Sequence, residues 1–333
     1  MLEIKDLFID IESHNGTVNA VRGVSLNVKR KELLAIVGES GCGKSILCRS
    51  IIKLLPKGAN IKSGEIIVNG KHVENMSEKD AYNFRGKDVG VIFQNPMTAL
   101  NPTITIGNQI TEALLVHKNI SKKEAIEEAI KLMELVGIDY PRERFNQYPH
   151  EFSGGMRQRI VIAIAVSCKP ELVIADEPTT ALDVTIQKQI LDLLVHIKRD
   201  HNSAVVLVSH DLGVVSSVAD KVAIMYAGKI LEVGKTNEIF SNPQHPYTKG
   251  LLNSLPSFNE EKEYLDTIGG IPPSLINPLK GDPFAERNKK AFKIDFKEDP
   301  PKVKISDTHF VYSWEAFYEK NKDNIEYLEG EAL

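Results

Sequence analysis

The sequence predicts an α/β protein built on a parallel sheet. Three short apolar runs, residues 33–37, 172–176 and 205–208, have the length of buried strands, and segments with helical spacing alternate with them. A glycine-rich turn, residues 38–45, joins the first run to a helical segment. In such a sheet, ligand chemistry is expected at the carboxyl ends of the strands. Four polar residues follow these ends: Lys44, Asp176, Glu177 and His210.

The bulk properties of the chain narrow the class of protein. Its 333 residues allow one large domain with an appendage. A formal charge of −4 argues against nonspecific nucleic-acid binding as the main activity. The three cysteines are scattered and indicate neither a disulfide framework nor a zinc site. The first residues carry charges, unlike a signal peptide, and the longest apolar run, 160–168, is too short to span a bilayer. We therefore expect a soluble intracellular chain whose membrane role, if any, comes through a partner.

The elements before the second apolar run follow in order. Residues 2–37 have the partial alternation of strands, and residues 66–68 predict another strand that ends in a tight Asn69-Gly70 turn. Residues 89–93 form a further short apolar run. Residues 103–149 change to helical spacing and predict an inserted helical lobe.

The elements after the lobe are a helix from about 156 to 167 and an amphipathic helix over 186–199. Beyond about residue 235 prolines become frequent and make long regular elements unfavourable. We expect an appended C-terminal region there. It would end in a short helix whose Trp314, Phe317 and Tyr318 pack back onto the body.

The turn at 38–45 matches the phosphate-binding pattern G-x-x-x-x-G-K-[ST] in its strand–turn–helix context. Its glycines let successive backbone N–H groups point at an anion, and the helix N-terminus adds the positive end of its dipole. Lys44 would contact the β- and γ-phosphates, and the Ser45 hydroxyl would bind Mg²⁺. The alternative is a glycine-rich loop with a surface lysine. The predicted nucleotide-binding residues are Gly38, Glu39, Ser40, Gly41, Cys42, Gly43, Lys44, Ser45 and Ile46.

The two acids after the second run have different predicted roles beside such a loop. Asp176 would hold Mg²⁺ through its water shell, and Glu177 would act as the general base on the attacking water. An acidic turn after a strand is the alternative. His210 is either a γ-phosphate sensor or a hydrogen-bonded core histidine, and its place after the third run favours the sensor. Gln94 means little by itself.

A second anion-binding helix start is predicted at Ser153-Gly154-Gly155, before the helix that begins at about Met156. One ATP does not need two phosphate cradles in one chain. The economical explanation is that each chain's second cradle closes on its partner's nucleotide.

Together these motifs resemble the ATP-binding cassette (ABC) ATPases, and over nearly its whole length the chain resembles the subunits of oligopeptide/dipeptide importers. Residues 38–45 match Walker A, 172–176 Walker B, and Glu177 the catalytic glutamate. Further matches are Gln94 for the Q-loop, residues 181–183 with Asp183 for the D-loop, His210 for the switch histidine, and Ser153, Gly154, Gly155 and Met156 for the signature motif. The subfamily shows in residues 93–102 and 209–215, in His245-Pro246-Tyr247-Thr248 and in residues 270–275.

The resemblance implies a P-loop (RecA-like) ABC ATPase core with a mixed sheet, an inserted α-helical subdomain and a C-terminal extension. The ATPase domain would span residues 1–235, with the subdomain at about 103–165, and the extension 236–333. Catalysis would fall to Glu177, His210 and Gln94, and Mg²⁺ to Ser45, Gln94 and Asp176.

The resemblance also implies partners. They are two transmembrane permease subunits, a sister ABC ATPase in a heterodimer and, indirectly, an extracytoplasmic substrate-binding protein, with no nucleic acid. The chain would sit peripherally on the cytoplasmic face of a prokaryotic cell membrane. Its cargo would be oligopeptides or dipeptides, with nickel or another small solute as the alternative. A soluble non-transport ABC ATPase is the less favoured interpretation.

Two positions depart from the family pattern. The aromatic residue that stacks on adenine is replaced by Asn15, so the contact could fall to Val18. Four cysteines that resemble an iron–sulfur site in relatives are also replaced, and since such clusters require thiolates we expect none here. A hard-metal site using two of the aspartates is the alternative. The substituting residues are Asp282, Asn288, Asp295 (or its neighbour Phe296) and Ser313.

Overall fold

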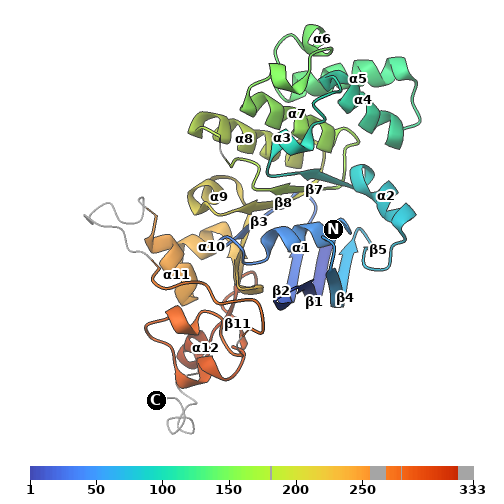
Figure 1. Ribbon diagram of the computed structural model, residues 1–333. Helices are drawn as coiled ribbons and strands as arrows, with labels where there is room; N and C mark the ends of the chain where they lie inside the picture. The colour runs from blue at the N-terminus through green and yellow to red at the C-terminus, as the bar shows by residue number, and fades with distance from the viewer. Residues whose placement is uncertain (181, 256–267, 279, 322–333) are drawn as a thin grey trace.

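The computed structural model describes residues 1–180, 182–255, 268–278 and 280–321, which form two sheets with helices between and around them (Figure 1). One sheet is antiparallel, with the strand order β2-β1-β4-β5. Asn69 and Gly70 both have positive φ (50° and 80°), as a tight hairpin turn of this kind requires. The predicted turn is therefore confirmed. The strands are β1 (Leu2–Ser13), β2 (Gly16–Val28), β4 (Ala59–Val68) and β5 (Lys71–His72).

The second sheet is mixed, as predicted, and carries the strands that end in polar residues. Its order within the described residues is β11-β12-β10-β9-β3-β8-β7-β6. The strands from β9 to β6 are parallel, whereas β10, β12 and β11 add to the β9 edge in antiparallel fashion. Every residue of β3 and β8 is buried, because helices or the other sheet cover both faces. The bounds are β3 (Leu33–Val37), β6 (Val89–Ile92), β7 (Leu172–Asp176), β8 (Ala204–Ser209), β9 (Lys221–Tyr226), β10 (Lys229–Lys235), β11 (Lys302–Lys304) and β12 (Phe310–Tyr312).

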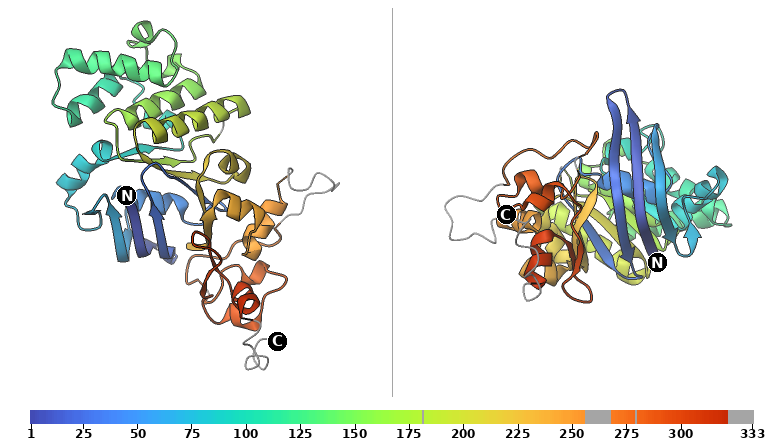
Figure 2. Two further views of the ribbon diagram at one scale, coloured as in Figure 1. Left: turned by 180° about the vertical axis from the view of Figure 1, so that it is seen from behind. Right: turned by 90° about the horizontal axis from the view of Figure 1, so that it is seen from below.

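Helices fill the space between and around the sheets (Figures 1 and 2). Helix α1 (Lys44–Ile51) lies between the two sheets, where its Leu47 and Ile51 share one core with both. Helices α7 (Gly154–Val166) and α8 (Val184–Asp200) share a second core with β7 and β8. Two further helices flank the sheets: α2 (Glu78–Lys87) and α9 (Leu212–Val218).

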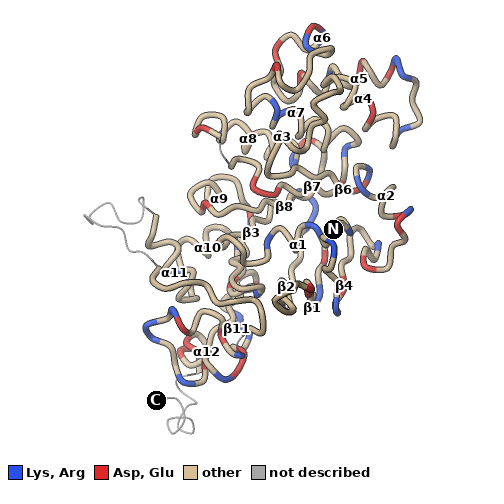
Figure 3. The backbone as a smooth tube through the Cα atoms, in the orientation of Figure 1, with Lys and Arg blue, Asp and Glu red and all other residues tan. Residues whose placement is uncertain are grey.

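The helical lobe lies at one end of the molecule, above β7 and β8 in Figure 1. The predicted helical spacing over 103–149 is confirmed, and the Ser121–Glu124 capping box fixes the start of one helix. Basic and acidic residues are interspersed over the lobe and the extension (Figure 3). No helix among the described residues is both long and apolar enough to cross a bilayer. The lobe contains α3 (Pro96–Ala99), α4 (Ile106–His117), α5 (Lys122–Leu135), α6 (Pro141–Arg144) and the 3₁₀ turn Pro149–Glu151.

The C-terminal segment contains α10 (Thr236–Ser241), α11 (Pro246–Asn253) and α12 (Trp314–Lys320). The predicted short terminal helix is α12, and its aromatic residues make contacts with other residues of the extension. Trp314 Nε1 donates to the carbonyl of Glu298, and the Tyr318 ring lies 5.4 Å from that of Phe292. The link to the body is instead the β11–β12 hairpin, whose β12 pairs with β10. No apolar periodicity marked these three-residue strands.

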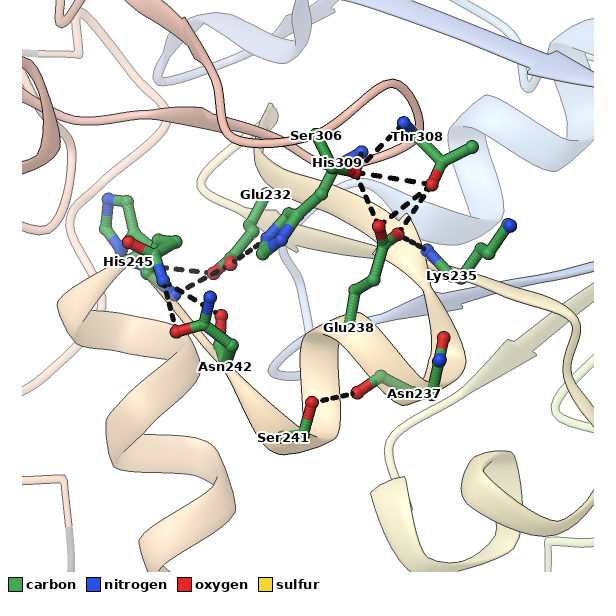
Figure 4. Close-up of polar contacts among 11 residues, drawn as sticks. Glu232, Lys235, Asn237, Glu238, Ser241, Asn242, His245, Ser306, Thr308 and His309 are labelled. Carbon is green, nitrogen blue, oxygen red and sulfur yellow. Dashed lines mark hydrogen bonds and ion pairs between the residues drawn. The ribbon is translucent and has the colours of Figure 1, made fainter. Parts of the chain in front are cut away.

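Two glutamates, one on β10 and one on α10, anchor the returning hairpin (Figure 4). Glu232 on β10 is fully buried, with His309 Nε2 2.7 Å from its Oε1, and it accepts the N–H groups of Gln244 and His245. Burial raises the pKa of Glu232, but the hydrogen bonds from His309 and these N–H groups outweigh it and leave the pKa below its ordinary value. Glu238 on α10 accepts the hydroxyls of Ser306 and Thr308.

The positions that match relatives' cysteines have local structural contacts. Asp282 and Asp295 accept the N–H groups of Phe284 and Phe292, and Asn288 that of Lys290. Ser313 caps α12 by accepting from Ala316. No group of three or more His, Cys, Asp or Glu side chains among the described residues is arranged to hold a metal ion. These side chains therefore organise turns and a helix start.

Removing the Glu232 carboxylate should destabilise the protein strongly. Glu232→Ala leaves the buried His309 and the N–H groups of Gln244 and His245 without this acceptor, so we expect a loss of roughly 3–5 kcal/mol of unfolding free energy. Glu238→Ala, at the half-buried anchor of the same hairpin, should have a clearly smaller effect. Urea denaturation measures both. Equal losses would show that the buried network has no special role.

Asp295 should make stability depend on pH. Burial, with the nearby Asp282 charge, raises the Asp295 pKa to about 6. The folded state thus binds a proton more tightly than the unfolded one, and stability falls as the pH rises from about 4 through 6. Asp295→Asn should remove this dependence and stabilise the protein at pH 7.5 by about 1–3 kcal/mol.

Denaturation at several pH values tests this, with the exposed Glu298→Gln as the control. A variant that keeps the pH dependence of the wild type would contradict the assignment.

Candidate functional site

The loop between β3 and α1 has the shape of a phosphate cradle. Gly43 has a φ of 104°, and a Cβ placed there would lie 2.2 Å from the carbonyl oxygen of Ala20, so no other residue fits. Gly41 is also left-handed, with a φ of 78°. The loop thus curls tightly between β3 and α1 while β2 passes close behind it.

Lys44 is buried at the start of α1, with 5% of its surface exposed. Its Nζ donates to the carbonyl oxygens of Gly38 and Glu39, at 2.7 and 2.8 Å. Both acceptors belong to the loop itself, so the ammonium group is held inside the cradle. Lys44 can exchange these two carbonyl oxygens for phosphate oxygens, which accept strong hydrogen bonds from an ammonium group.

Ser45 and Asp176, two of the three residues predicted to bind Mg²⁺, meet directly. Ser45 Oγ donates to Asp176 Oδ1 at 3.1 Å, although the residues lie on α1 and β7. Burial raises the Asp176 pKa, the Ser45 hydrogen bond opposes this shift, and the neighbouring Glu177 charge adds to it. A bound cation would offset the cost of burying the charge of this carboxylate.

These groups fit Mg²⁺, which prefers oxygen ligands and binds proteins through one or two side chains together with substrate phosphates and water. The Gln94 amide completes the predicted set of Mg²⁺ ligands, and Gln94 and Ser45 line one cavity.

Glu177 is the point on which the predicted catalytic residues converge. Its Oε2 accepts from Gln94 Nε2 at 2.9 Å and lies 3.5 Å from His210 Nδ1. Glu177 itself has a left-handed backbone, with a φ of 46°, and its N–H donates to Val208 on the neighbouring strand. This strained turn points the carboxylate toward Gln94 and His210, which come from the ends of β6 and β8.

A cavity of about 290 Å³ opens above the loop. Gln94 and Glu177 line it on the catalytic side, together with loop and helix-start residues. Of the predicted nucleotide-binding residues, those that line it are Ser40, Gly41, Gly43, Lys44, Ser45 and Ile46. The other three pack instead against β9, the turn after it or the extension: Gly38, Cys42 and Glu39.

The predicted signature residues lie elsewhere in the chain. Ser153 is exposed and caps α7 by accepting from the N–H of Met156. Asp183 caps α8, and that helix packs on the signature turn because Ile186 lies beneath Gly155. Ala181, the first residue of the predicted D-loop, lies outside the described residues. The structure therefore does not bring the signature turn to the cavity of its own chain.

Several residues at the site were missed from the sequence. Thr180 Oγ1 donates to Glu177 Oε2 at 3.0 Å, three residues further along the chain. Leu275 lines the cavity, and the Arg287 guanidinium lies 2.9 Å from Glu39 Oε2. Tyr247, whose hydroxyl accepts the N–H of Glu39, and Leu275 fall in segments that marked the subfamily. No spacing in the sequence placed either segment beside the loop. Val18 does line the cavity.

Comparisons with known proteins agree with this geometry. The ABC transporter family matches residues 21–180, and the family described as oligopeptide/dipeptide transporter, C-terminal region, matches residues 231–294. The oligopeptide transport ATP-binding protein OppD of Bacillus subtilis is 54% identical, over 94% of this chain and 88% of its own. The dipeptide transport ATP-binding protein DppD of Lactococcus lactis is 49% identical, over 94% of this chain and 90% of its own.

A solved structure is similar in fold. It is a dimeric ATP-binding cassette in a post-hydrolysis state bound to ADP and Pi, 25% identical, with a TM-score of 0.64 over 71% of this chain and 99% of its own. The cassette fold, the phosphate loop and the high identity to curated relatives lead to one conclusion. The chain belongs to the ABC transporter ATP-binding proteins, in the oligopeptide/dipeptide branch of that family.

Proposed function

We propose that this chain is the ATP-hydrolysing subunit of an import complex that takes up oligopeptides or dipeptides across the cell membrane. The observation that carries the proposal is the meeting of Gln94, Glu177 and His210 beside a phosphate loop. Both curated relatives are named for peptide transport, which favours peptide cargo over nickel. The interspersed surface charges give no support to a nucleic-acid partner (Figure 3).

In this proposal the triphosphate lies along the loop at residues 38–45. Lys44 exchanges its two loop carbonyls for β- and γ-phosphate oxygens. Ser45, Asp176 and Gln94 would hold Mg²⁺, which would offset phosphate charge when bound. Glu177 accepts a proton from the attacking water, Gln94 and Thr180 orient that carboxylate, and His210 donates toward the γ-phosphate.

The signature turn completes the ATP site of a second subunit. Ser153, Gly154, Gly155 and Met156 form a helix start at which Ser153 and Gly154 are exposed and which does not line the chain's own cavity, and anions bind favourably at such a start. Two cassettes arranged head to tail place each turn over the other's nucleotide. The similar solved cassette is dimeric and holds ADP and Pi, which supports this arrangement. Asp183, next to the signature turn, faces the same interface.

The partners follow from the family. We propose a heterodimer with a sister ABC ATPase, docked on two transmembrane permease subunits at the cytoplasmic face, and indirectly an extracytoplasmic substrate-binding protein. Residues 1–235 form the ATPase domain, with the helical subdomain at about 103–165 transmitting motion to the permeases. Residues 236–333 form the extension. The first family match, 21–180, lies within the proposed ATPase domain, and the second, 231–294, begins just before the boundary.

Replacing the general base should separate binding from turnover. Glu177→Gln keeps the hydrogen-bonding shape but cannot take a proton, so ATPase activity with the partner subunit present should fall by about 10²–10⁴ while ATP binding persists. Glu65→Gln, an exposed carboxylate on β4, is the control and should match the wild type. Wild-type turnover by Glu177→Gln would refute the assigned role.

A charge at the signature turn should block closure of the two subunits. Ser153→Asp keeps a good helix cap but places a carboxylate against the partner's γ-phosphate. The substitution is made in the hydrolysis-deficient Glu177→Gln chain, so that bound ATP persists. The double variant should fold and bind ATP, yet fail to associate with the sister subunit when ATP is added. Ser153→Thr should associate normally. Light scattering after size-exclusion chromatography measures association, and unimpaired association of Ser153→Asp would overturn the head-to-tail arrangement.

A further inference from the structure

The cavity over the phosphate loop is lined by more than the loop and the catalytic residues. Its remaining lining is apolar: Ile11, Val18, Ala20 and Leu275. Val18 and Ala20 on β2 both line the cavity, and Ile11 on β1 pairs with Val18. Ala20 lies beside the loop at Gly43, whereas Val18 is two residues before it on β2.

Leu275 comes from the C-terminal extension and is fixed to the edge of β2. The N–H of Asn19 donates to the carbonyl oxygen of Leu275 at 2.8 Å, and Ile276 forms an antiparallel bridge with Val18. The segment therefore adds to the free edge of the antiparallel sheet, where β2 is the outermost strand. The Leu275 side chain is half-buried and packs against the core that includes Val37 and Tyr247.

A single arginine holds this segment and the phosphate loop together. The side chain of Arg287 donates to the carbonyls of Ile268 and Gly269, and Nη1 lies 2.9 Å from Glu39 Oε2. The Tyr247 hydroxyl accepts the N–H of Glu39 at 3.1 Å. The extension is thus held beside the cradle at Glu39.

We propose that Leu275 forms the apolar surface on which the nucleotide base rests, so that the C-terminal extension completes the ATP site of its own chain. The proposal rests on the proposed ATP site and adds the base contact to it. Among the described residues that line the cavity none is aromatic, so aliphatic contact from Leu275, Val18 and Ile11 takes the place of ring stacking. A base fits there because its faces are weakly hydrated while the phosphates stay on the polar loop.

The test compares ATP with inorganic tripolyphosphate, which has no base, in calorimetric titrations of the full chain with Mg²⁺. Leu275→Ala should weaken ATP binding about five- to tenfold, because part of a buried side chain is lost, and leave tripolyphosphate binding unchanged. Leu275→Met should bind ATP as the wild type does. Ile271→Ala, an 86% exposed position in the same segment, should change neither ligand.

Three results would overturn the proposal. The first is wild-type ATP affinity in Leu275→Ala, and the second is an equal loss of affinity for both ligands. The third is a loss of ATP affinity that appears only in His14→Ala, which would place the base on the exposed His14 ring of the β1–β2 turn instead. A wild-type chain that binds neither ligand would instead refute the ATP site itself, so the two failures can be told apart.

Discussion

The parallel pairing of β3, β8 and β7 is the constraint on which the site depends. Val37 pairs with Ser209, and Asp176 pairs with Val208, so the three strands end at nearly the same level. The phosphate loop, the carboxylate pair and His210 come directly after these strand ends and must therefore share one edge. A shift in this register would separate Ser45 from Asp176 and Glu177 from His210. The full burial of β3 and β8 fixes that register, because their side chains have no alternative environment.

The extension depends on the same sheet. Its hairpin continues the β9 edge through β10 and β12, and Glu232 on β10 binds the returning chain at His309. Arg287 then reaches the phosphate loop at Glu39. A segment joined to the sheet at one end and to the cradle at the other cannot move freely relative to the nucleotide. This is why a contact as small as that of Leu275 can be held in place.

The sequence predicted the elements whose signals are local. The apolar runs of β3, β7 and β8, the Asn69-Gly70 turn and the phosphate loop each carry their own pattern. Proximity in space was predictable only where strand order implies it, as for Lys44, Asp176, Glu177 and His210. Arg287 and Glu39 are 248 residues apart, and no periodicity or spacing relates them. The hairpin β11–β12 was not predicted because three-residue strands are too short to show alternation.

In the proposed scheme the signature turn and Leu275 divide the ATP site between cis and trans parts. The chain's own sheet edge would serve the phosphates, Mg²⁺ and the attacking water, and its own extension would serve the base. The outer face of the triphosphate would be left for a second subunit, to which the exposed Ser153 turn would correspond. Affinity for the nucleotide would then be set within one chain and closure by the pair. Changes in the extension would therefore tune how tightly ATP binds without altering Glu177, while changes at Ser153 would alter closure without altering the cradle.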